Sequence, residues 1–67
     1  MAGQIKYMID KIIDQKAQGD EALMYLMQAK LALKGINTRR YDSHSKDDPI
    51  VLEKLRQAAK DFGVTLS

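Results

Sequence analysis

The side chains best suited to chemistry lie in one polar segment, residues 35–49, which reads GINTRRYDSHSKDDP. It contains the single histidine, His44, and three carboxylates that can ligate a metal ion: Asp42, Asp47 and Asp48. A catalytic zinc site usually takes three protein ligands and commonly more than one His. A calcium loop needs an oxygen ligand at the position that Lys46 occupies. We therefore expect no metal ion and no cofactor in this segment.

Nucleophilic catalysis is the second chemistry to consider, because Asp42, Ser43 and His44 follow one another. A catalytic triad requires its side chains to converge in space, whereas consecutive side chains of an extended segment point in different directions. The sequence has no glycine-rich phosphate loop and no nucleophile elbow. A chain of 67 residues also has little volume for a pocket that excludes water. We expect a protein that is not an enzyme and has no small-molecule substrate.

Positive side chains make nucleic-acid binding the alternative function. Arg39, Arg40 and Lys46 are placed to contact phosphate groups, and further lysines follow in the third predicted helix. The net charge of +2 is small for a nucleic-acid-binding domain. A helix-turn-helix would need a polar recognition helix after a short turn. A nucleic-acid-binding or regulatory protein that uses Arg39, Arg40 and these lysines is therefore the less favoured interpretation.

Two helical segments precede this polar segment. The apolar residues of segment 4–17 repeat with the period of one helix face: Ile5, Met8, Ile9, Ile12 and Ile13. Gly19 and Asp20 then supply a helix stop and a helix start, so we predict a second helix over 21–34. The first stripe also continues in phase into the second segment. This leaves open an alternative, one long helix over 4–34 plus a short helix, packed as a homodimer.

The third predicted helix, over residues 49–62, has the clearest start. Asp48 is a favoured N-cap, and Pro49 stands at the first helical position, where its missing N–H costs nothing. We expect Asp47 to add a charge that is favourable to the dipole of this helix. Gly63 then ends the helix in a left-handed conformation.

We interpret the connection over 35–47 as a long ordered loop. Thr38 is expected to cap a short turn. Ile36 and Tyr41 are expected to pack inward as anchors. No structural role is expected for His44, and the loop is otherwise built from turn-forming residues.

The segment ALMYLMQAKLAL, residues 22–33, is apolar on almost every side, because only Gln28 and Lys30 are polar. A surface helix usually shows one apolar stripe, and a wider apolar surface marks an interaction site. We expect the stripe that faces the core to be Leu23, Leu26 and Leu33. We predict a protein interface, most simply that of a symmetric homodimer, formed by Leu23, Met24, Tyr25, Met27 and Leu31. The same helix could instead bind a different protein, and a further interpretation is a monomeric bundle with a few exposed apolar groups.

The composition limits the remaining choices. Sixty-seven residues make one domain at most, and a domain this small is marginal alone, which favours self-association. The absence of cysteine excludes disulfides and is compatible with the cytoplasm, the location that we expect. No apolar stretch is long enough to span a membrane.

The sequence therefore predicts a single helical domain over 1–67 of the all-α class. It has a helix hairpin, a long ordered loop and a third helix laid across the pair.

Overall fold

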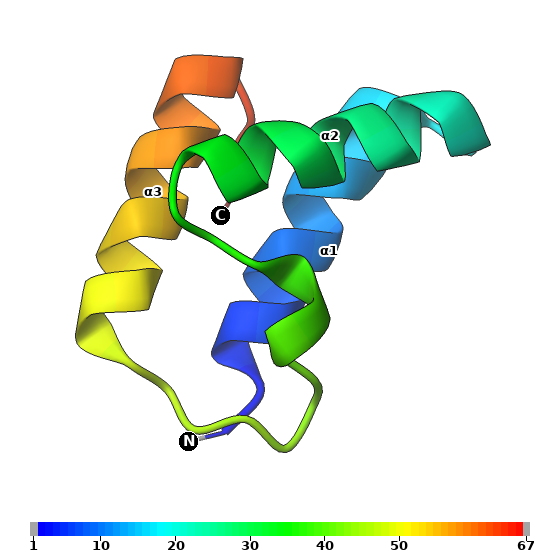
Figure 1. Ribbon diagram of the computed structural model, residues 1–67. Coiled ribbons are helices and arrows are strands. Elements are labelled where there is room, and N and C mark those ends of the chain that lie inside the picture. The colour runs from blue at the N-terminus through cyan, green and yellow to red at the C-terminus, as the bar shows by residue number, and fades with distance from the viewer. Residues whose placement is uncertain (1, 67) are drawn as a thin grey trace.

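The structure contains three α-helices and confirms the all-α fold class (Figure 1). It is a computed structural model, and it describes residues 2–66. The helices are α1 (Gln4–Ala17), α2 (Glu21–Leu33) and α3 (Pro49–Phe62). A short 3-10 helix, η1 (Thr38–Arg40), interrupts the connection between α2 and α3.

The crossing helix is α2. In Figure 1, α1 and α3 lie side by side with their N-terminal ends at the bottom, and α2 crosses them at the top. The expectation that α3 lies across an antiparallel pair is wrong. The long connection brings the chain back to the start of α1, where the backbone N–H of Gly3 donates to the carbonyl of Ser45 at 3.1 Å. Since α3 begins beside the start of α1, it runs alongside α1.

The core is apolar, and among the described residues no polar or charged side chain is buried. The largest share comes from α1: Ile5, Ile9, Ile12, Ile13 and Ala17. Helix α3 adds Leu52, Leu55, Ala58 and Ala59. Helix α2 adds only Met27 and Leu31. Ile36 is buried and Tyr41 is partly buried against the core, as predicted for the two loop anchors. Helix α1 is therefore the central helix, and α2 contacts the core through a narrow stripe of apolar side chains.

The chain turns sharply between α1 and α2. Gln18 has a φ of 49° and Gly19 a φ of 86°, both in the left-handed region, where a right-handed helix cannot continue. Asp20 then caps α2, because its carboxylate accepts hydrogen bonds from the backbone N–H groups of Ala22 (2.9 Å) and Leu23 (3.2 Å). The alternative of one continuous helix over 4–34 is therefore wrong.

The start of α1 is capped from the distant loop. The carboxylate of Asp47 accepts a hydrogen bond from the backbone N–H of Gln4 at 3.1 Å. We expected Asp47 to serve α3 instead. Gly3, at the N-cap position of α1, has no side chain that could accept this bond. The loop therefore supplies the N-terminal cap of α1.

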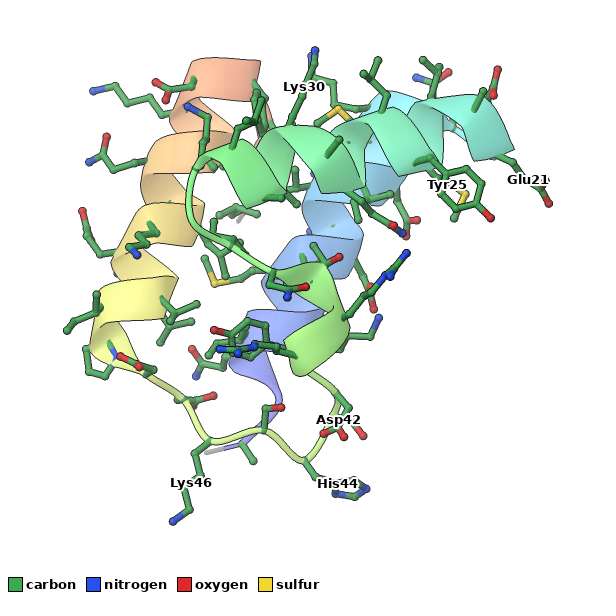
Figure 2. The ribbon with its side chains drawn as sticks, in the orientation of Figure 1. Glu21, Tyr25, Lys30, Asp42, His44 and Lys46 are labelled. Atoms are coloured by element: carbon green, nitrogen blue, oxygen red, sulfur yellow. The ribbon has the colours of Figure 1, made fainter. Side chains whose placement is uncertain are left out.

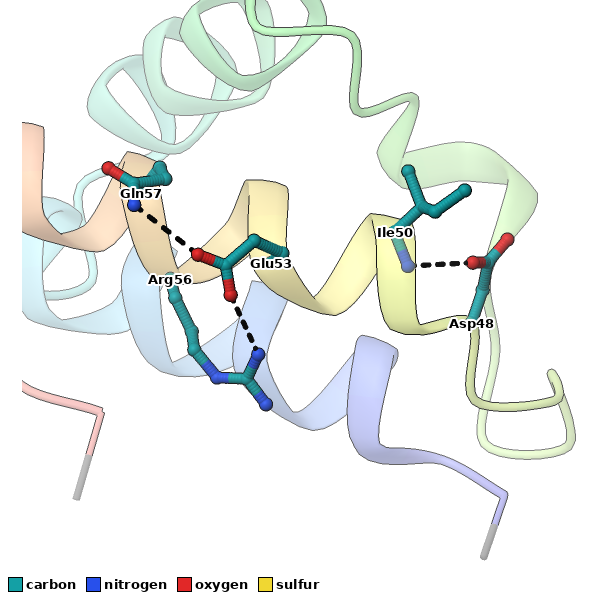
Figure 3. A network of polar contacts seen from close by, with 5 residues as sticks. All are labelled: Asp48, Ile50, Glu53, Arg56 and Gln57. Carbon is teal, nitrogen blue, oxygen red and sulfur yellow. Dashed lines mark hydrogen bonds and ion pairs between the residues drawn. The ribbon is translucent and has the colours of Figure 1, made fainter.

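Helix α3 starts and stops with the residues predicted for it. Asp48 accepts a hydrogen bond from the backbone N–H of Ile50 at 2.9 Å (Figure 3). At the other end, Gly63 has a φ of 71°, and the N–H of Val64 donates to the carbonyl of Ala59 at 2.8 Å. This hydrogen bond, which spans six residues from Ala59 to Val64, is characteristic of a Schellman motif.

The segment after α3 is bound to α1 through one side chain. The amide group of Gln15 donates to the carbonyl of Thr65 at 2.6 Å, and its oxygen accepts from the N–H of Thr65 at 3.1 Å. Gln15 thus pairs with the backbone of Thr65 as a neighbouring strand would. The contact holds Val64 in the core and Leu66 against it.

Candidate functional site

Helix α2 exposes leucine side chains on the side that faces away from the core. Leu33 is 88% exposed, Leu26 47% and Leu23 40%. Because an α-helix has 3.6 residues per turn, Leu26 and Leu33 lie on one line along the helix. Met24 is half-buried on the opposite side. We call the set Leu23, Leu26 and Leu33 the leucine face.

The predicted orientation of α2 about its own axis is therefore wrong. The stripe expected in the core is the exposed one, and the core is instead contacted by Met24, Met27 and Leu31. The physical reason is that α2 is apolar almost all round, so the period of its apolar residues does not distinguish one side from the other.

The predicted interface residues are divided between the surface and the core. Leu23 and Tyr25 are exposed, and Met24 is half-buried. Met27 and Leu31 are buried in the chain's own core, so the prediction that they form an exposed interface is wrong. Leu26 and Leu33 were missed as surface residues.

One sequence signal would have oriented α2 correctly. The N–H of Ile36 donates to the carbonyl of Leu31 at 2.9 Å, and that of Gly35 donates to Ala32 at 3.0 Å. These two bonds make a Schellman motif, in which the residue after the glycine packs against the residue five positions before it. Gly35-Ile36 therefore places Leu31, and not Leu33, on the core side.

A second surface of α2 lies beside η1. There a groove of about 690 Å³ has six polar residues in its lining: Tyr25, Gln28, Asn37, Thr38, Arg39 and Arg40. The other lining residues are alanines of α2 and Gly35. No carboxylate lines it, and Tyr25 is 67% exposed. We call it the arginine groove.

The short helix η1 presents the two arginines to this groove. Asn37 caps η1, since its side-chain oxygen accepts from the backbone N–H of Arg39 at 3.1 Å. The prediction that Thr38 is the cap is wrong, because Thr38 is already the first residue of η1. Within residues 2–66, neither Arg39 nor Arg40 has an ion-pair partner.

Lys46, the third predicted phosphate contact, lies elsewhere. Its backbone forms a single antiparallel bridge with Ala2. Figure 2 shows Lys46 and His44 at the end of the molecule opposite to α2, far from Tyr25. The structure thus brings Arg39 and Arg40 together and separates them from Lys46.

The loop carboxylates bind backbone groups. Asp42 accepts from the N–H of His44 at 2.7 Å, while Asp47 and Asp48 cap helices. Over the described part of the chain, no three His, Asp or Glu side chains gather in a group that could hold a metal ion.

Glu53 on α3 is the centre of a surface network (Figure 3). Hydrogen bonds from the side chains of Gln57 (3.3 Å) and Arg56 (3.1 Å) lower the pKa of the Glu53 carboxyl, with Gln57 the larger cause. A carboxyl group with a lowered pKa is ionised at neutral pH and is poorly suited to act as a general acid there.

Comparison with known proteins found no matching family model, no matching curated protein and no matching solved structure. None of the helices within residues 2–66 has the length and apolar content that crossing a bilayer requires.

Proposed function

We propose that this chain is a small, non-enzymatic protein–protein interaction module that self-associates through the leucine face of α2. The observation that carries the proposal is the exposure of Leu23, Leu26 and Leu33 on one helix, 88% for Leu33. Clustered exposed apolar side chains of this kind mark interaction surfaces. A cytoplasmic location belongs to the same proposal and is supported by the cysteine-free composition.

The size of the leucine face sets the strength of the association. Burying a leucine side chain fully contributes about 1.5–3 kcal/mol, and Leu23 and Leu26 are only partly exposed to begin with. A standard interface covers about 800 Å² per partner, roughly a sixth of this chain's surface of 4649 Å². One helix of 13 residues supplies less than that. We therefore expect a weak dimer that forms and dissociates with concentration.

The helix dipole favours an antiparallel arrangement of α2 with a second copy of the chain. Glu21 stands at the start of α2 and Lys30 in its last turn, and both side chains project into solvent (Figure 2). Within the described residues, neither has an ion-pair partner. Nine residues separate Glu21 from Lys30, about 180° around the helix, so only Lys30 lies beside the leucine face. A twofold axis that pairs α2 antiparallel with its copy through this face therefore leaves Glu21 outside the contact, but it opposes the two helix dipoles, which is favourable.

Sedimentation velocity tests the proposal. We expect the wild-type chain to sediment between its monomer mass of 7.6 kDa and the dimer at micromolar concentration. Leu26→Glu places a charge in the leucine face and should give a monomer at every concentration. The control is Ile50→Glu, because Ile50 is 69% exposed on α3, away from the leucine face.

Two results would contradict self-association through this face. One is a wild-type chain that stays monomeric throughout the concentration series. The other is a dimer that Ile50→Glu disrupts as strongly as Leu26→Glu does. Circular dichroism of each variant establishes that the helices are intact.

A further inference from the structure

The arginine groove combines an exposed aromatic ring with two guanidinium groups that form no ion pair with residues 2–66. We propose that it binds single-stranded nucleic acid, with Tyr25 stacking on a base and Arg39 and Arg40 contacting the phosphates on either side. This goes beyond self-association, because it assigns a ligand to the other flank of α2.

The charges of the groove favour an anionic ligand. Arg39 and Arg40 line it together, no carboxylate lines it, and neither arginine forms an ion pair with the described residues. A guanidinium group presents a planar set of donors that matches the oxygens of a phosphate group. Two of the chain's eleven positive side chains therefore lie together at η1.

The ring of Tyr25 favours a base as the neighbour of those phosphates. Tyr25 is 67% exposed although it lines the groove, so the side chain is accessible to a base. Base–aromatic stacking beside a positive groove is the usual mode of single-strand binding. Bases in a duplex are already stacked on one another and cannot reach the ring. A phosphorylated peptide would satisfy the arginines but leave the ring without a flat partner.

Other polar groups of the groove suit a nucleotide as well. The oxygen of the Asn37 side chain is used by the N–H of Arg39, which leaves its amide N–H groups to donate. Gln28 and Thr38 add further donors and acceptors at the same surface. A groove of about 690 Å³ is within the usual range of ligand sites.

The groove and the leucine face are separable. Tyr25 and Ala32 lie on one line of α2, seven residues apart, as Leu26 and Leu33 do on another. The two lines are offset by one residue, which is about 100° around the helix. Substitutions in the groove therefore leave the leucine face unchanged, and the two proposals can fail independently.

Fluorescence anisotropy with a short, labelled, mixed-sequence single strand tests this proposal. With two phosphate contacts, we expect the affinity to fall about sevenfold between 50 and 200 mM salt. Arg39→Gln and Arg40→Gln should each weaken binding and reduce this salt dependence. Tyr25→Ala should weaken binding at least about fivefold, whereas Tyr25→Phe keeps the ring and the affinity.

The control variant is Lys46→Gln, which also removes one positive charge but lies away from the groove. It should bind the strand almost as well as the wild type does. The proposal is overturned if no strand binds, or if Lys46→Gln weakens binding as much as Arg39→Gln. It is also overturned if a duplex of the same sequence, or a phosphorylated peptide, binds as tightly. All the substituted side chains are exposed, and circular dichroism checks that the variants fold.

Discussion

The carboxylate of Asp47 accepts a hydrogen bond from the backbone N–H of Gln4, 3.1 Å away in space and 43 positions earlier in the chain. Gly3, which precedes Gln4, makes no side-chain cap. The first turn of α1 is thus completed by the loop that leads into α3. This bond joins the beginning of one helix to the approach to another, and its removal has a measurable cost.

Asp47→Ala should lower the free energy of unfolding by about 1 kcal/mol, the usual cost of losing an N-cap. Urea denaturation followed by circular dichroism measures it. Asp47→Asn keeps an acceptor oxygen and should cost less. The control, Asp14→Ala, removes an exposed carboxylate that caps no helix, and it should change stability by less than about 0.5 kcal/mol. Equal losses for Asp47→Ala and Asp14→Ala would contradict the capping role.

Gly19→Ala should destabilise the fold by about 1–2 kcal/mol, because Gly19 has a φ of 86° and a side chain is strained there. A Cβ atom at this position would meet nothing within 4 Å, so the cost is backbone strain and not a clash. Gly19→Asn should cost less, since Asn tolerates the left-handed region better. Thermal unfolding measures both variants. A more stable Gly19→Ala variant would instead indicate a continuous helix.

Leu31→Ala and Leu33→Ala form a pair that tests the orientation of α2. Leu31 is fully buried, so its truncation should cost about 2–5 kcal/mol. Leu33 is 88% exposed, so its truncation should change stability by less than about 0.5 kcal/mol at concentrations where the chain is monomeric. Chemical denaturation at low protein concentration provides the comparison. The reverse order would place the leucine face in the core.

Glu53 should titrate below its ordinary pKa of 4.5, because Gln57 and Arg56 donate hydrogen bonds to its ionised form. Since the pKa is lowered on folding, the stabilisation is present above the ordinary pKa and is lost as the pH falls through the folded pKa. NMR titration of the Glu53 side chain measures the midpoint. Gln57→Ala should raise the midpoint toward 4.5, whereas an unchanged midpoint would remove the assigned cause.

The ends of the helices could be predicted from the sequence because local chemistry sets them. Gly19-Asp20 stops one helix and starts the next, and Asp48 caps α3 one residue before Pro49. Each signal acts over a few residues, so no knowledge of the tertiary structure was needed.

The orientation of α2 was predicted wrongly although Gly35-Ile36 indicates it, and the role of Asp47 has no local signal. Helix α2 is apolar on nearly all sides, so two opposite stripes fit the core equally well by pattern alone. Asp47 lies two residues before Pro49, and nothing local indicates that its partner is Gln4. The arginine groove depends on the same kind of information, because only the fold brings Tyr25 beside Arg39 and Arg40.

The bonds at the two ends of α1 join residues far apart in the chain, and this separation predicts an order of folding. Gln4 pairs with Asp47, and Gln15 pairs with Thr65, 50 positions later. The turn between α1 and α2 needs only residues that are close in sequence, so this hairpin can form early. The two distant pairings close afterwards, and contacts that form after the rate-limiting step slow unfolding without accelerating folding. We therefore expect the ends of α1, the central helix, to close last, so that loss of either bond should speed unfolding more than it slows folding.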